Sequence, residues 1–189
     1  MEIFKKRGYS FPETPITAFH CGDIAGLKRH LRRDPALISR RFGLREIYPS
    51  ALGCVDNGRG GMCGTPLDGA TLLHLAIEFD EQEIFDLLLA EGADVNARAL
   101  VDADGFGGHT PLFNAIVKMG QRSDALIVRA LLDRGALPGI RATMRKYLDW
   151  CETPRWHEAR NVTAAEWGRG FPERDWVNEQ ALEVLEGAA

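Results

Sequence analysis

The sequence predicts an all-α fold in the main, an α-solenoid of about four helix-turn-helix repeats with long insertions between them. Two observations carry this prediction. Apolar residues recur three and four positions apart in paired short segments, as they do on the buried face of a helix. The two clearest pairs also begin alike, because a threonine able to cap a helix precedes the first apolar run at both Thr71 and Thr110.

The clearest pair occupies residues 69–98. Thr71 offers its hydroxyl to an unpaired N–H at a helix start, and apolar residues dominate the run that follows at 72–77. A polar turn at 80–82 separates this run from a second one at 84–89. Gly92 then suits the left-handed conformation that ends many helices. We therefore expect two short antiparallel helices joined by a tight turn.

The same pattern returns after Gly108. Thr110 is again the candidate cap, and Pro111 stands at the first helical position, where its missing N–H would be unpaired anyway. Apolar runs follow at 112–117 and 127–132, and Gly135 ends the second. Weaker copies of the pattern lie near both ends of the chain, at about 15–37 and 163–185.

Two of these segments identify a known family. Thr110-Pro111-Leu112 and the run from Thr71 to Ala76 resemble the T-P-L-H-x-A signature of ankyrin repeats, and residues 92–98 resemble the link between two such repeats. The resemblance implies a single ankyrin-repeat domain over residues 1–189, with repeats at about 14–39, 69–98, 109–141 and 162–187. It also implies a scaffold that binds another protein and is not an enzyme. Weak end copies fit this view, because terminal repeats of an array need a polar outer face.

The links between the repeats are longer than a unit of ~33 residues requires. Thr71 and Thr110 lie 39 positions apart, and Thr110 and Thr163 lie 53 apart. Most of the excess falls in three hairpin-side insertions, at 40–68, 99–108 and 142–161, in the links where the resemblance implies β-hairpins. Equivalent positions of stacked repeats lie on the same side, so we expect the three insertions to meet on one face, which is often the binding face.

The insertions hold aromatic and arginine side chains, the types that dominate binding energy at protein interfaces. We predict that a partner protein binds to the following residues: Tyr48, Arg59, Phe106, Tyr147, Trp150, Trp156 and His157. A second interpretation is that these aromatic residues form a satellite core that packs the long links down. A third is an enzyme or small-ligand binder with a site where the insertions converge. A pocket joining His157, His109 and Asp102 or Asp104 would favour that third interpretation.

The metal-binding patterns in the chain are incomplete. Cys54, Cys63, Cys151 and His157 are residue types that bind zinc, but Cys54 and Cys63 are nine positions apart rather than in a tight pair. A disulfide between these two would suit an oxidising compartment. The run 102–105 resembles the start of a calcium loop and lacks the distal glutamate. We predict no metal and no cofactor. His74 is expected to tie neighbouring turns together, and Asn96 to bond within its own turn.

The composition is that of an ordinary globular protein. The chain has 189 residues, 45% of them hydrophobic, and a net charge of -4, so it does not resemble a nucleic-acid binder. The basic residues at 28–41 are interpreted as a solvated helix face. No apolar run is long enough to span a membrane, and no signal peptide follows Met1. The few cysteines favour a reducing compartment, so we expect a cytoplasmic protein. We also expect it to be a monomer.

Overall fold

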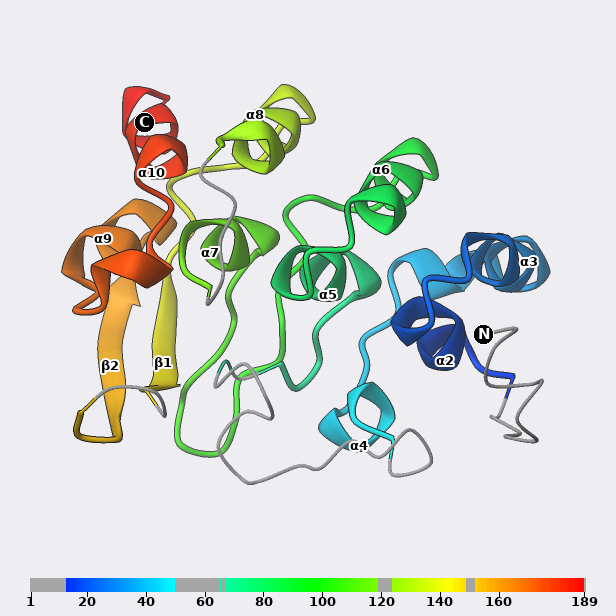
Figure 1. The fold of residues 1–189 in the computed structure, drawn as a ribbon, viewed down its shortest axis with the longest axis horizontal. Helices are drawn as coiled ribbons and strands as arrows, with labels where there is room; N and C mark the ends of the chain where they lie inside the picture. The colour runs from blue at the N-terminus through cyan, green and yellow to red at the C-terminus, as the bar shows by residue number, and fades with distance from the viewer. Residues whose placement is uncertain (1–12, 50–64, 66, 119–123, 149–151, 189) are drawn as a thin grey trace.

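Paired helices make up most of the described chain (Figure 1). The computed structural model describes residues 13–49, 65, 67–118, 124–148 and 152–188. The paired helices are α2 (Pro15–His20) with α3 (Ile24–Arg33), α5 (Leu72–Glu78) with α6 (Gln82–Ala90), α7 (Pro111–Ile116) with α8 (Leu126–Asp133), and α9 (Ala164–Gly170) with α10 (Glu179–Gly187). The first helices of the pairs form one row and the second helices another, with α7 packed between α5 and α9.

The two best-defined pairs begin and end where the sequence predicts. Thr71 is the N-cap of α5 and Thr110 is the N-cap of α7, with Pro111 as the first residue of α7. Gly92 and Gly135 follow the second helices with φ of +83° and +85°. These are left-handed values that a residue with a Cβ adopts at a cost, so the predicted helix ends are confirmed.

Residues 142–148 and 155–162 form the two strands of a β-hairpin, and the predicted all-α solenoid of about four repeats is therefore wrong. Strand β1 (Ala142–Leu148) pairs antiparallel with β2 (Arg155–Val162) in a two-stranded sheet. The burial of β1 alternates strictly, with Met144, Lys146 and Leu148 inside and the residues between them half-buried. That period of two is typical of a strand. In the sequence this alternation is difficult to recognise, because Lys146 occupies one of the inward positions and a charged residue normally indicates the solvent side.

Shorter elements lie between these helices. They are η1 (Pro35–Ile38) and α4 (Leu44–Ile47), which lie between α3 and α5, and η4 (Arg174–Trp176), which lies between α9 and α10. One core cluster runs through all four helical pairs, from Ile16 in α2 to Leu185 in α10. Trp167 of α9 is its largest wholly buried side chain and lies behind the hairpin, against which α9 packs.

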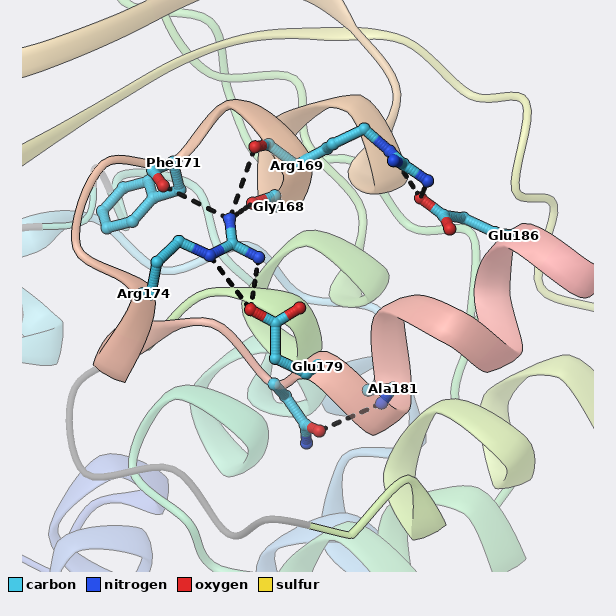
Figure 2. A network of polar contacts seen from close by, with 8 residues as sticks. Gly168, Arg169, Phe171, Arg174, Glu179, Ala181 and Glu186 are labelled. Carbon is cyan, nitrogen blue, oxygen red and sulfur yellow. Dashed lines mark hydrogen bonds and ion pairs between the residues drawn. The ribbon is translucent and has the colours of Figure 1, made fainter.

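Arg174 holds the last helical pair together, as Figure 2 shows. Its Nη1 donates to the carbonyl oxygens of Gly168 at 2.9 Å and Phe171 at 3.4 Å, and its Nε donates to Glu179 Oε1 at 3.0 Å. The last carbonyls of a helix have no donor within the helix. One guanidinium group therefore caps the end of α9 and fixes the first turn of α10 beside it.

The side chain of Asn96 bonds to the following link rather than within its own turn, contrary to the prediction. Its Nδ2 donates to the carbonyl of Gly135 at 2.9 Å, and its Oδ1 accepts from the N–H of Leu137 at 2.8 Å. The amide thus ties the link after α6 to the link after α8. The turn itself is held by the Asp94 carboxylate, which accepts from the Asn96 N–H at 2.8 Å.

Candidate interaction surface

The three inserted segments contact one another at the described residues. The N–H of Leu100 donates to the carbonyl of Asp68 at 3.2 Å, which joins the second insertion to the first. The N–H of Gly107 donates to the carbonyl of Thr143 at 2.7 Å, which joins the second insertion to β1. The described parts of the three segments therefore lie together. Most of the first insertion lies outside the described residues.

A tight loop at 102–107 sets the position of Phe106. The Asp102 Oδ1 accepts from the N–H of Asp104 at 3.0 Å and from that of Phe106 at 2.9 Å. Gly107 has φ of +118°, and a Cβ there would lie 2.0 Å from the carbonyl oxygen of Leu100, so this position accepts glycine alone. The loop therefore presents Phe106 to the hairpin in one fixed orientation.

Aromatic rings and guanidinium groups stack on the outer side of the hairpin. The Cζ of Arg145 lies 4.7 Å from the ring centroid of Phe106 and 5.0 Å from that of Trp156, and the Cζ of Arg160 lies 4.8 Å from the Phe106 centroid. Tyr147 is paired with Trp156 across the strands, and their rings meet edge-on at 5.1 Å. We call the surface formed by these five residues the hairpin face: Phe106, Arg145, Tyr147, Trp156 and Arg160.

Two carboxylates fix Arg145 between its rings. Its Nη2 lies 2.7 Å from Asp102 Oδ2, and its Nη1 lies 3.3 Å from Asp104 Oδ2. Stacking of a guanidinium on aromatic rings is itself favourable. Phe106 is 3% exposed, so the surface open to a partner consists of Trp156, Tyr147 and the edges of the two guanidinium groups. The loop and the hairpin thus form one rigid, charged and aromatic surface.

His157 lies on the opposite, inward side of the hairpin. Its ring stacks on Trp167 at 5.1 Å and meets Phe171 edge-on at 5.1 Å. Burial, and then the positive charge of Arg155, hold the pKa of His157 below its ordinary value. This aromatic cluster packs the hairpin onto α9, as the satellite-core interpretation expects for some of the aromatic residues.

The structure brings together Phe106, Tyr147 and Trp156 from the predicted partner-binding set. Tyr48 lies elsewhere, buried beside Phe79 with ring centroids 6.3 Å apart. Arg59 and Trp150 lie outside the described residues. Sequence reasoning missed Arg145 and Arg160, which lie on the hairpin face. The alternation along 142–148 would have placed Arg145 on the same side as Tyr147 if that run had been assigned as a strand.

A buried polar network lies behind the hairpin, and sequence reasoning missed it as well. Glu78 Oε1 accepts from Lys146 Nζ at 3.1 Å and from Thr65 Oγ1 at 2.7 Å, and Oε2 accepts from Asn114 Nδ2 at 2.7 Å. Lys146 also donates to Thr65 Oγ1. Both oxygens of the carboxylate therefore have donors, so the network satisfies a buried charge pair between α5 and β1 and leaves Glu78 no unpaired oxygen.

His74 ties two segments together, as predicted. Its Nδ1 accepts from Thr71 Oγ1 at 2.9 Å, and its Nε2 donates to the carbonyl of His109 at 3.2 Å. Burial lowers the pKa of His74 from 6.5 to about 4, so the ring is neutral at pH 7. His109 packs on His74 and Phe113, and neither of its ring nitrogens has a hydrogen-bond partner in the part of the chain that the structure describes.

The groups named for a catalytic pocket lie in different surroundings. His109 is fully buried beside His74, His157 packs on Trp167, and Asp102 is paired with Arg145. A cavity of about 10 Å³ lined by Asp80, Lys118 and Asn178 has room for one water molecule. In the described ranges, no three His, Cys, Asp or Glu residues are grouped to hold a metal ion. Cys54, Cys63 and Cys151 lie outside those ranges.

Residues 68–100 match the family model for the ankyrin repeat. The chain carries an ankyrin repeat. This ankyrin repeat contains α5 and α6, together with the cap Thr71 and the helix-ending Gly92. The match covers a single repeat. The other helical pairs lie outside the matched residues and are defined by the structure alone. No curated protein matches the chain. Among the described residues, no helix has both the length and the apolar character needed to cross a membrane.

Proposed function

We propose that this protein is an interaction module that binds a partner protein through the hairpin face. The ankyrin repeat supports the general class, since such repeats serve mainly as frameworks for protein binding. The finer proposal rests on one observation. Arg145 is clamped between Phe106 and Trp156 by two carboxylates, and this arrangement leaves an ordered aromatic and arginine surface at the outside of the molecule.

Pre-organisation favours binding at this surface. A flexible side chain loses rotamer freedom when a partner immobilises it, and this loss weakens the complex. Arg145 already has its ion pairs and its ring contacts, and Trp156 is already packed against Tyr147. Tryptophan, tyrosine and arginine are also the types most often found among the residues that dominate binding energy.

The ankyrin repeat gives the surface a rigid base. Glu78 at the end of α5 is paired with Lys146 in β1, one residue along from Arg145 and on the opposite side of the strand. The second insertion adds a backbone bond from Gly107 to Thr143. The hairpin face therefore cannot move far without breaking a buried ion pair.

Affinity capture tests the proposal. The full chain and its Tyr147→Ala/Trp156→Ala variant are immobilised, and the proteins retained from a cell extract are quantified by mass spectrometry. We expect at least one protein to be retained by the native chain and to be depleted about 10-fold or more with the variant. Leu126→Ala, at a residue of α8 that is 58% exposed, is the control and retains the protein fully. Equal retention by the native chain and the double variant would contradict the proposal.

A further inference from the structure

The outer edge of β2 has no neighbouring strand among the described residues. Strand β2 pairs with β1, and β1 is bridged on its other side to Gly107, so the sheet ends at β2 (Figure 1). In the described part of the chain, no backbone hydrogen bond joins residues 156–160 to any segment other than β1. Every second residue of an edge strand directs its N–H and C=O outward, where another strand can bind.

The open edge has a defined end. Asn161 takes a left-handed φ of +51°, its N–H donates to Thr143 Oγ1 at 3.3 Å, and its carbonyl accepts from Arg141. Regular pairing therefore stops before Asn161. Residues 156–160 offer a straight segment of roughly 17 Å at about 3.4 Å per residue, which matches a short extended peptide.

Arg160 gives this edge a chemical preference. The residue is exposed, its guanidinium stacks on Phe106, and it has no ion pair within the described residues. Arg145, which stacks on the same ring, is instead paired with Asp102 and Asp104. A guanidinium stacked by its plane keeps N–H donors at its edge in the fork that fits a carboxylate.

We propose that the edge of β2 binds an extended acidic peptide segment of the partner protein, which adds as a third strand and places a carboxylate on Arg160. The proposal deepens, and rests on, the function proposed above. Trp156 and Arg160 are four positions apart, and alternate residues of a strand share a face. The segment therefore carries an acidic residue and an apolar residue four positions apart, one opposite Arg160 and the other opposite Trp156.

Selection of random peptides displayed on phage against the immobilised full chain tests this inference. The expected peptides carry Asp or Glu and an apolar residue at that four-residue spacing. Bound to the chain, a synthetic copy of the leading peptide slows amide hydrogen exchange within 156–160, because the N–H groups that face away from β1 gain acceptors. Arg160→Gln is expected to weaken its binding about 10-fold or more, since a hydrogen-bonded charge is lost. The control Arg129→Gln, at an exposed residue of α8, leaves the affinity unchanged.

A second peptide with the acid replaced by its amide completes the test. It is expected to bind the native chain as weakly as the acidic peptide binds Arg160→Gln, with no further loss when both changes are combined. Additive losses, or protection of amides away from β2, would overturn the inference, as would a failure to select any peptide. Protection of 156–160 by self-association of the chain would assign the edge to a second copy instead. Partner capture that depends on Trp156 but not on Arg160 or the β2 amides would refute this inference alone and leave the proposed function standing.

Discussion

Lys146 donates a hydrogen bond to Glu78 inside the core, with 3.1 Å between Nζ and Oε1 and side chains that are 1% and 0% exposed. The pair joins strand β1 to the last residue of α5, 68 positions earlier in the chain. Thr65 and Asn114 complete the hydrogen bonds of the carboxylate. The ankyrin repeat and the hairpin are therefore linked by a charge pair that is shielded from water.

Lys146→Met is expected to lower the free energy of unfolding by about 3–5 kcal/mol, because it leaves the charge of Glu78 buried without a cation. Urea denaturation measures the loss. Arg40→Met is the control. It removes the Arg40–Glu46 pair, whose side chains are each 47% exposed, and such pairs contribute about 0–1 kcal/mol. Equal losses in the two variants would show that Lys146 does not stabilise the core through Glu78.

The free energy of unfolding is expected to fall in acid because burial lowers the pKa of His74. Above pH 6.5 the ring is neutral in both states and adds no pH dependence. Between pH 6.5 and about 4 the unfolded chain binds a proton that the folded chain does not, so the free energy of unfolding falls, by about 3 kcal/mol in total. Denaturation at a series of pH values checks this. His74→Gln flattens the curve over that window, and an unchanged slope would remove His74 as its source.

His109 and His74 are expected to respond oppositely to leucine. His109→Leu leaves the stability at pH 7 unchanged or raises it, because it removes buried ring nitrogens that have no partner among the described residues. His74→Leu lowers the stability by about 1–3 kcal/mol, because the Thr71 N–H and hydroxyl lose their acceptor. Thermal or urea unfolding of the two variants separates them. A larger loss for His109→Leu than for His74→Leu would reverse the roles assigned here.

Leu88→Ala tests the packing of the ankyrin repeat. Leu88 of α6 is 0% exposed, so its truncation is expected to leave a cavity and to lower stability by about 2–5 kcal/mol. Leu126→Ala, at 58% exposure, is the matched substitution and should change stability by less than about 0.5 kcal/mol. A near-neutral result for Leu88→Ala would undermine the assignment of α6 as a core helix.

The helices were predictable because their signals are local. Thr71, Thr110 and Pro111 mark helix starts, and Gly92 and Gly135 follow helix ends, through interactions within a few residues of each position. The family resemblance implied hairpins in the links, but the strands at 142–148 and 155–162 were not assigned, because Lys146 occupies an inward position of β1. The buried charge of Lys146 is tolerated because Glu78 pairs with it. Glu78 lies 68 positions away in the chain, so a local pattern of residue types cannot reveal the pair. The all-α prediction failed at this pair.

The candidate surface was predicted in part for the same reason. Phe106, Tyr147 and Trp156 were found as aromatic residues in insertions, and stacking of repeats predicts that insertions meet. Arg145 and Arg160 were missed, since their roles depend on strand alternation and on the loop that holds Phe106 beneath them. Tyr48 has the same residue type as Tyr147 but lies in the core. Residue type alone therefore did not distinguish a surface tyrosine from a core tyrosine.

Site-specific photo-crosslinking tests directly whether a partner protein binds at the hairpin face. A photoreactive amino acid is placed at Glu158, which is paired with Arg145 across the strands and is exposed, or at Leu126 of α8 as the control position. We expect one dominant crosslinked protein from position 158, lost with Tyr147→Ala/Trp156→Ala, and none in common from position 126. Crosslinks to the same protein from 126 but not from 158 would show that the partner binds elsewhere.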